Sequence, residues 1–236
     1  MKLFLFKVIN QLQILLNKLA KDLYLDSSCE SLYPLKKIFY LLKFQAEVKA
    51  IPGMVSDQEA QILFMLAASQ SLSGNIVEIG SWLGKSTVHL AKACQVSGNG
   101  QVYAIDTFKG NPGKEKMYFG PLELKESMLA RFKANLQLAG VEDFVKIYPM
   151  SSLQASKKVQ EKIRLLFIDG CHDYLGAKSD FLLWHRKVKV GGLIIFDDFH
   201  SHFPGVVRTV REELLNTDSY QIILVMGSCL VVKKIK

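Results

Sequence analysis

The hydrophobic and polar positions of the chain change their period at regular intervals. From residue 76 onward, apolar runs of about four residues alternate with stretches in which apolar positions recur every three or four residues. Short apolar runs are typical of buried strands, and the longer period is typical of helices. Strands that alternate with helices predict a mostly parallel sheet that is covered on both faces.

The individual elements follow from these runs. The predicted strands are 76–79, 102–105, 145–148, 165–168, 193–196, 222–225 and 230–232, and the predicted helices are 57–71, 85–94, 123–139, one through Phe181 and Trp184, and 206–215. Only four residues join the last two strands, which is too short for a crossover, so these strands form a hairpin and one runs antiparallel. The sequence therefore predicts a doubly wound α/β fold with a seven-stranded sheet.

The first fifty residues follow a different pattern. They predict two helices, and in the first of these Phe4, Val8, Leu12, Leu15, Leu19 and Leu23 share one face. Such a helix either packs on its own domain or on a second copy, in a homo-oligomer, or lies on a membrane surface through residues 1–25. Ile51-Pro52-Gly53 ends the pattern, which divides the chain into a helical extension, 1–50, and a domain, 51–236.

Composition and charge narrow the class of protein. Apolar residues make up 49% and charged residues 22%, which are globular values and exclude a disordered or collagen-like chain. There is no apolar run of membrane-spanning length and no signal cleavage site, and four widely spaced cysteines indicate reduced thiols, so we expect a cytoplasmic protein. The net charge of +8 comes largely from lysines near the two ends, without the arginine-rich stripe of a nucleic-acid binder.

Two polar clusters follow the first two predicted strands and are typical of nucleotide binding. The first contains Glu78, Gly80, Ser81, Trp82 and Gly84. Its glycines allow a tight turn into the next helix, whose free N–H groups favour an anionic group. The second is Asp106, whose carboxylate can accept ribose hydroxyls. The GxxxG spacing differs from the GxGxxG of dinucleotide sites, so it favours S-adenosylmethionine over a dinucleotide.

A third cluster is acidic and follows the fourth and fifth predicted strands. Asp169 ends one strand, and Asp197 and Asp198 end the other. Adjacent strand ends lie about 5 Å apart, so these carboxylates can converge and raise one another's pKa unless a cation binds. All-oxygen ligands suit Mg²⁺, Mn²⁺ or Ca²⁺; the alternative is that one or two of them cap helices. His172 can lean over the same site and is suited to proton abstraction.

Four segments, VEIGSWLGKST, AIDTF, FIDGCHDY and GGLIIFDDF, resemble in this order the class I S-adenosylmethionine-dependent methyltransferases. The metal-dependent branch with macrocin-type O-methyltransferases and cephalosporin hydroxylase-like proteins is the most similar. The resemblance covers about residues 51–236 and implies a Rossmann-like methyltransferase fold. It implies that Glu78 and Gly80 line the methionine part of the cofactor, that Asp106 holds the ribose, that Asp169, Asp197 and Asp198 bind the metal, and that His172 is the base.

The chain departs from the family pattern after the third predicted strand. Members often have an acidic or polar residue near the adenine, whereas this chain has Pro149-Met150-Ser151-Ser152, which leaves Ser151 as the candidate. The resemblance implies an O-methyltransferase that uses Mg²⁺ and acts on a hydroxyl of a sugar, a glycan or a small secondary metabolite. Two alternatives stay open: an NAD-type oxidoreductase on a related sheet, and a non-catalytic adaptor that docks through its N-terminal helix.

Overall fold

The structure is a computed structural model that describes residues 44, 45, 47–110 and 127–236. The chain divides into two compact units, Met1–Lys49 and Ala50–Lys236, and the second unit is described below. The predicted N-terminal helices, and with them the predicted membrane or subunit contact through residues 1–25, lie outside the described residues apart from a short helical stretch around Phe44 to Val48. No helix among the described residues is long and apolar enough to cross a membrane.

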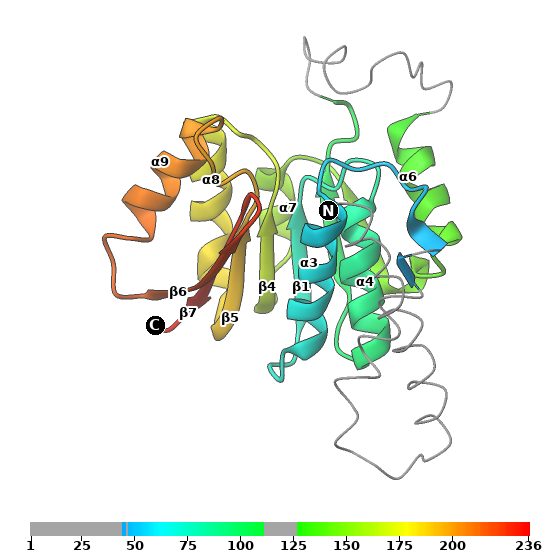
Figure 1. The fold of residues 1–236 in the computed structure, drawn as a ribbon, viewed down its shortest axis with the longest axis horizontal. Helices are drawn as coiled ribbons and strands as arrows, with labels where there is room; N and C mark the ends of the chain where they lie inside the picture. Colours follow the sequence, from blue (N-terminus) through cyan, green and yellow to red (C-terminus); the bar gives the residue numbers. More distant parts are fainter. Residues whose placement is uncertain (1–43, 46, 111–126) are drawn as a thin grey trace, which may run out of the picture. The chain divides into compact units, whose positions relative to one another are not determined.

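The second unit is built on the predicted seven-stranded sheet, whose order is β3-β2-β1-β4-β5-β7-β6 (Figure 1). The strands are β1 Asn75–Ile79, β2 Val102–Asp106, β3 Val145–Pro149, β4 Ile163–Ile168, β5 Val188–Phe196, β6 Tyr220–Met226 and β7 Cys229–Lys234. Strand β7 pairs antiparallel with both β5 and β6, and the other pairings are parallel. The predicted fold class and the C-terminal hairpin are confirmed.

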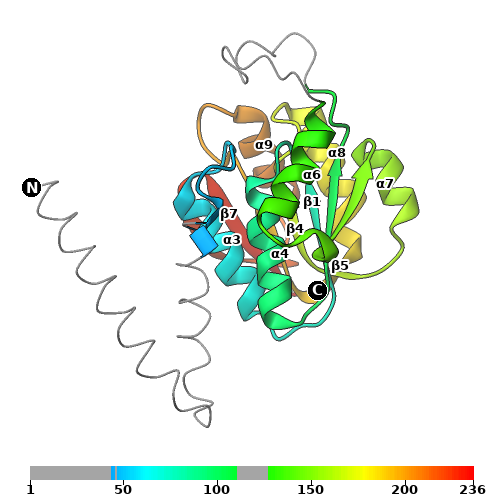
Figure 2. The ribbon, with the colours of Figure 1, turned by 90° about the vertical axis from the view of Figure 1, so that its right-hand side faces the viewer.

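Helices cover both faces of the sheet. The helices are α3 Asp57–Ser69, α4 Lys85–Ser97, α6 Met128–Leu138, α7 Ser152–Lys158, α8 Tyr174–Trp184 and α9 Pro204–Glu213, with short 3₁₀ turns at Glu142–Phe144 and His185–Lys187. Figures 1 and 2 show α3, α4 and α6 on one face and α7 and α8 on the other, where α8 also packs against α9. An apolar cluster that includes Phe181, Trp184 and Phe196 lies on this second face.

The structure also departs from the sequence prediction. Helix α7 was not predicted, because it has only seven residues and buries one apolar side chain, Ala155. Strand β5 begins at Val188 rather than residue 193, because Lys189 and Gly191 interrupt its apolar run. Among the residues described, the helix predicted from 123 begins at Met128, where Ser127 caps it through the backbone N–H of Ala130.

Arg164 ties the sheet to α3 at the end of β4 remote from Asp169. Its side chain is fully buried, and its guanidinium donates to the carbonyl oxygens of Ala67 at 2.6 Å and Gly74 at 2.8 Å and to Gln70 Oε1 at 3.0 Å. The buried guanidinium is thus satisfied by neutral acceptors rather than by a carboxylate, and hydrogen bonds stabilise its charge. This holds α3, and with it Glu59, at a fixed place beside the sheet.

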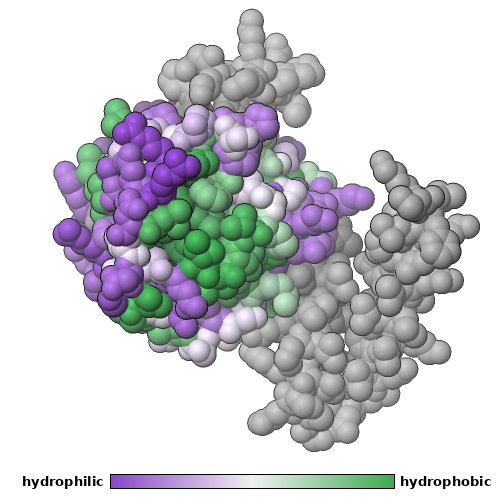
Figure 3. Space-filling model, turned by 60° about the vertical axis from the view of Figure 1, so that its left-hand side comes forward, coloured by the Kyte–Doolittle hydropathy of each residue, from purple (hydrophilic) through white to green (hydrophobic). Residues whose placement is uncertain are grey.

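Strand β6 forms an apolar edge of the sheet. Its exposed apolar side chains are Ile222, Ile223, Val225 and Met226. Figure 3 shows a hydrophobic area on this side of the molecule, between polar regions. Exposed apolar surface of this kind marks interaction sites, and the predicted homo-oligomer stays a prediction.

Candidate active site

The carboxyl ends of β1, β2, β4 and β5 open into one cavity of about 560 Å³. Nine of the predicted site residues line it: Gly80, Ser81, Trp82, Asp106, Ser151, Asp169, His172, Asp197 and Asp198. Glu78 and Gly84 do not line it. The topology therefore brings the nucleotide-type clusters and the acidic cluster to one place, at the edge of the sheet where ligands of open α/β sheets bind.

Gly80 forms the turn at which β1 meets the cavity. Its φ angle is +90°, and its N–H donates to the carbonyl oxygen of Ile105 at 2.9 Å. A Cβ atom at this position would overlap the carbonyl oxygen of Asp169. Only glycine combines this φ angle with such a close approach. The absence of a side chain at Gly80 therefore allows the turn after β1 to pack directly against the backbone of Asp169 at the end of β4.

Glu78 lies behind this turn and supports it. Its side chain is fully buried, and Oε2 accepts hydrogen bonds from Ser81 Oγ at 2.8 Å and Thr87 Oγ1 at 2.5 Å. Burial raises the pKa of Glu78 to about 7, although the neighbouring hydroxyl groups counteract this effect. Oε1 is the only buried side-chain nitrogen or oxygen atom of the described residues without a hydrogen-bond partner. A bound group or an ordered water commonly satisfies such an acceptor.

Asp106 joins two loops at the rim of the cavity. Its Oδ2 accepts from the N–H of Trp82 at 2.9 Å, and Oδ1 accepts from the N–H of Phe108 at 2.7 Å. Both donors have positive φ angles, so the carboxylate holds two unusual backbone conformations in place. Each oxygen retains a further acceptor position, and the predicted contact of Asp106 with ribose hydroxyls stays a prediction.

Gly84 and Ser151 have structural roles at helix ends. Gly84 has a φ angle of +95° at the start of α4 and packs against the ring of Phe132. Ser151 caps α7: its hydroxyl accepts from the N–H of Gln154 at 3.3 Å and donates to Gln154 Oε1 at 3.1 Å. The Ser151 proton is therefore already used, and its predicted adenine contact stays a prediction.

Two of the three predicted metal ligands come together with the predicted base. Asp169, His172 and Asp198 bring ligand atoms within 4.8 Å of one another, and His172 Nε2 lies 3.0 Å from Asp198 Oδ2. Burial raises the pKa of Asp169 well above its usual range, and the charges of Asp197 and Asp198 raise it further. Three nearby carboxylates therefore need either a proton or a cation to be stable.

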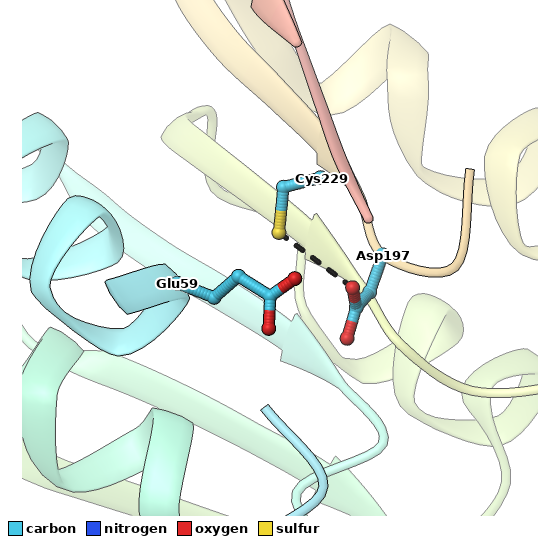
Figure 4. A group of neighbouring side chains, drawn as sticks. All are labelled: Glu59, Asp197 and Cys229. Carbon is cyan, nitrogen blue, oxygen red and sulfur yellow. Dashed lines mark hydrogen bonds between the residues drawn. The ribbon is translucent and has the colours of Figure 1, made fainter. Parts of the chain in front are cut away.

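The third predicted ligand, Asp197, faces another group of residues. Its Oδ1 accepts from Ser228 Oγ at 2.5 Å, from the Asp198 N–H at 2.8 Å and from Cys229 Sγ at 3.6 Å. Figure 4 shows the carboxylates of Glu59 and Asp197 side by side, with Cys229 above them and its hydrogen bond to Asp197 dashed. All three of these hydrogen bonds are to Oδ1, and Asp197 lines the cavity. The carboxylate is thus held by one oxygen while the other is available.

Glu59, on α3, adjoins Asp197 and was not among the predicted site residues. Its Oε2 accepts from the N–H of Ser56 at 2.7 Å, in a capping box at the start of α3. Its Oε1 accepts from the N–H of Ser228 at 2.9 Å and lies 2.7 Å from the Ser228 hydroxyl, whose single proton is shared with Asp197 Oδ1. Burial opposes ionisation, but the bonds from Ser228 and Ser56 outweigh it and lower the pKa of Glu59 to about 2. Ser228 thus links Glu59 to Asp197.

Two further histidines lie beside the acidic group. His200 Nε2 is 3.7 Å from Asp198 Oδ1, and His202 Nδ1 is 3.1 Å from His200 Nδ1. The ring of Phe203 lies 4.7 Å from the His172 ring and 5.0 Å from the His200 ring, measured between centroids. Asp198 therefore has an imidazole near each of its oxygens. Among the described residues, Cys94, Cys171 and Cys229 form no disulfide bond.

A family model described as a methyltransferase domain matches residues 77–199, a little over half of the chain. An uncharacterized protein of Acanthamoeba polyphaga mimivirus is 40% identical over 52 residues, which are 21% of this chain and 24% of that protein. The chain thus spans about a quarter of the length of this relative. The family match favours a methyltransferase over the NAD-type oxidoreductase.

Solved structures support the same fold. The O-methyltransferase NovP is 18% identical, with 88% of this chain and 100% of NovP covered and a TM-score of 0.65. Cofactor-bound Rv0187 from MTB is 20% identical over 90% of this chain and 95% of its own, with a TM-score of 0.59. An O-methyltransferase from Bacillus cereus in complex with SAH is 18% identical over 92% and 97%, with a TM-score of 0.57. The chain therefore belongs to the methyltransferase-domain family and has the fold of the class I, S-adenosylmethionine-dependent methyltransferases.

Proposed function

We propose that this protein transfers a methyl group from S-adenosylmethionine to a hydroxyl oxygen, with a divalent metal ion at the acidic group. The observation that carries the proposal is the juxtaposition of Asp169, His172 and Asp198 on the wall of the cavity that Gly80 and Asp106 also line. A methyl donor and a hydroxyl acceptor must meet in one space, and this cavity supplies features for both. NovP and the Bacillus cereus protein are described as O-methyltransferases, which supports oxygen as the acceptor atom.

The residues present fit the cofactor. Gly80 lines the cavity, and its φ angle of +90° turns the chain from β1 towards α4, whose free N–H groups begin after Gly84. Asp106 retains free acceptor positions for ribose hydroxyls, whereas Glu78 lies behind the turn and would act through Ser81, which lines the cavity. The Bacillus cereus protein is described as bound to SAH, a ligand of the same class.

The residues present also fit a divalent cation. Asp169 and Asp198 would hold it, with Asp197 Oδ2 as a third oxygen ligand, and this oxygen set suits Mg²⁺ or Mn²⁺. When bound, the metal supplies Lewis-acid stabilisation of an ionised hydroxyl. The raised pKa of Asp169 supports this interpretation, because a cation removes the repulsion that otherwise keeps the carboxyl protonated.

His172 would take the proton of the acceptor hydroxyl. Its Nε2 lies 3.0 Å from Asp198 Oδ2, which favours the tautomer that carries its proton on Nε2. Nδ1 then keeps a lone pair for the acceptor. Asp198 would orient the ring, and the ring of Phe203 at 4.7 Å limits its rotation. Holding oxygen, methyl carbon and sulfur in line would provide much of the remaining acceleration.

The acceptor that we propose is a sugar, glycan or small-metabolite hydroxyl with a neighbouring oxygen. Two adjacent oxygens of the acceptor can chelate one cation. The acidic group would hold that cation, and the base on the same wall would take the proton of the hydroxyl. The experiment is isothermal titration with S-adenosylhomocysteine in Mg²⁺ and in EDTA, followed by methyl-transfer assays on a catechol, on a glycoside with a vicinal diol and on matched mono-hydroxyl compounds.

Each outcome of this experiment has a distinct meaning. Binding in both buffers, with Mg²⁺-dependent transfer to the diol-type acceptors only, supports the whole proposal. If methyl transfer is as fast in EDTA as in Mg²⁺, the proposed role of the metal is refuted, whereas the proposed cofactor stands. Binding without transfer to any acceptor would favour the non-catalytic adaptor. No binding by a folded protein would refute the cofactor, and a titration with NAD would then follow.

A further inference from the structure

Strand β6 ends the sheet with an edge that no other described strand covers. It pairs antiparallel with β7 on one side, and it is the last strand in the sheet order, so its other side has no partner strand among the described residues. The backbone N–H and C=O groups of a strand point alternately to its two sides, and those on the outer side of β6 can therefore bond to a further strand.

The composition of β6 favours such pairing. The strand runs from Tyr220 to Met226 and contains no charged residue and no proline, which are the features that usually protect an edge strand. One protective feature is present, a bulge at Ile223, where the register with β7 shifts. The bulge does not shield the edge, because Ile222, Ile223 and Val225 all remain exposed.

The exposed side chains of β6 lie on both faces of the sheet. Ile222 and Val225 stand opposite residues of β7 that belong to the apolar cluster on the face covered by α7 and α8. Met226 stands opposite Cys229, which adjoins Glu59 of α3 on the other face. A helix that lay on one face would leave the apolar side chains of the other face exposed. A strand added to the edge would extend both faces at once.

We propose that β6 of a second copy of the chain occupies this edge, so that the two seven-stranded sheets join into one continuous sheet. In antiparallel pairing about a two-fold axis, a strand meets its own reversed sequence. An uncharged strand suits this arrangement, because no like charges oppose each other across the axis, whereas a charged partner strand would gain no ion pair from β6. The two-fold contact is closed, so association stops at two copies. This inference does not depend on the proposed reaction.

The first test is sedimentation velocity of the full chain over a range of concentrations, for the wild type and for Val225→Lys. Val225 is 55% exposed, so its replacement removes no core contact. We expect a wild-type dimer, and association of the variant that is at least ~30-fold weaker, because both copies then bring a lysine to the contact. Leu138→Lys is the matched control and should associate like the wild type. Leu138 is 62% exposed on α6, which leads toward β3 at the opposite edge of the sheet.

Hydrogen exchange of the wild-type protein locates the contact without any variant. As the concentration rises and dimers form, the backbone amides of β6 that point away from β7 should exchange more slowly. The amides of β3, the other edge strand, should exchange at the same rate at every concentration, and they serve as the internal control.

Three results would overturn the proposal. A wild type that stays monomeric at every concentration shows that the edge does not bind a second copy. A dimer of undiminished affinity in Val225→Lys, or a wild-type dimer whose β6 amides gain no protection, places the contact on another surface. Assemblies larger than a dimer exclude the closed two-fold pairing. Slower exchange in β6 together with loss of the dimer in Val225→Lys alone supports it.

Discussion

The two halves of the cavity are built by different means. At the ends of β1 and β2, backbone conformation shapes the wall: Gly80, Trp82 and the adjoining Phe108 adopt positive φ angles, and Asp106 accepts two backbone N–H groups. At the ends of β4 and β5, the wall consists of carboxylates whose partners are side chains, such as His172 on Asp198 and Ser228 on Asp197. We refer to these as the cofactor half and the acidic half.

This difference predicts that a substitution in one half leaves the function of the other half largely unchanged. A wall of backbone groups is set by turns within a few residues and is formed before any ligand binds. A wall of carboxylates is stable only with a proton or a cation, so its state depends on pH and on metal. Cofactor binding should therefore survive substitutions that abolish methyl transfer, and the predictions below test that separation.

The largest expected effect is that of Asp169→Asn. We expect no detectable Mg²⁺-dependent transfer, because the amide removes the charge and one oxygen ligand of the acidic half. The affinity for S-adenosylhomocysteine should change by less than about 3-fold, because the substitution lies in the acidic half and leaves the residues of the cofactor half unchanged. Rate assays and titration on the same preparation measure both quantities. Asp143→Asn, at an exposed acid, is the control. Equal loss of transfer and cofactor affinity would show that the halves are not separate.

The second expected effect is that of His172→Gln, which keeps a polar side chain without a titrating ring. The rate of transfer should fall by ~10²–10⁴-fold, the range for loss of a general base. Mg²⁺ affinity should fall much less, because Asp169 and Asp198 remain. Rates measured from pH 6 to pH 9 test the assignment. A variant with the wild-type rate at every pH would exclude His172 as the base, and a large loss of metal affinity would instead make it a ligand.

The residues at the ends of β1 and β2 could be placed from the sequence because local rules determine their positions. A tight turn after a strand requires residues such as Gly80, and a carboxylate at the end of the next strand is placed by the parallel register of β1 with β2. Both signals lie within one strand–helix–strand unit. The hairpin of β6 and β7 was predictable for a similar reason, since the length of a short connection determines the direction of the strands.

For the acidic half, the sequence predicted which acids lie near one another but not the direction in which each side chain points. Strand ends placed Asp169, Asp197 and Asp198 near one another, but the direction of Asp197 depends on Ser228, which is bound to Glu59 169 residues earlier in the chain. No periodicity connects residues that far apart.

A smaller effect, on stability, concerns Glu78 in the cofactor half. Its pKa is raised to about 7 in the folded chain, from an ordinary value of 4.5, so the folded state holds this proton more tightly than the unfolded state does. The stabilisation is complete below about pH 4.5 and is lost as the pH rises through 7. We expect the ligand-free protein to lose about 2 kcal/mol of unfolding free energy from this group between pH 5 and pH 8.

Denaturant unfolding of the wild type and Glu78→Gln at these two pH values measures this contribution. The amide does not titrate, so the variant should lose less stability over the interval than the wild type does. The acidic half contributes in the same direction in both proteins, because the raised pKa of Asp169 is common to them. Identical pH dependence of the two proteins would mean that Glu78 stays ionised in the fold, with Oε1 satisfied by a water.

The smallest expected effect, and the one that most sharpens the comparison, is that of Ser228→Ala. The Ser228 hydroxyl lies 2.7 Å from Glu59 Oε1 and 2.5 Å from Asp197 Oδ1, so its removal frees Asp197 without touching the other proposed ligands. We expect Mg²⁺ or Mn²⁺ affinity to fall ~10-fold, as for other groups that orient a ligand, while cofactor affinity stays unchanged. Titration with each metal, with Ser71→Ala as an exposed control, measures this. Tighter metal binding in Ser228→Ala would have the opposite meaning: Ser228 and Glu59 would then hold Asp197 away from the metal, and Asp169 and Asp198 would be the principal ligands.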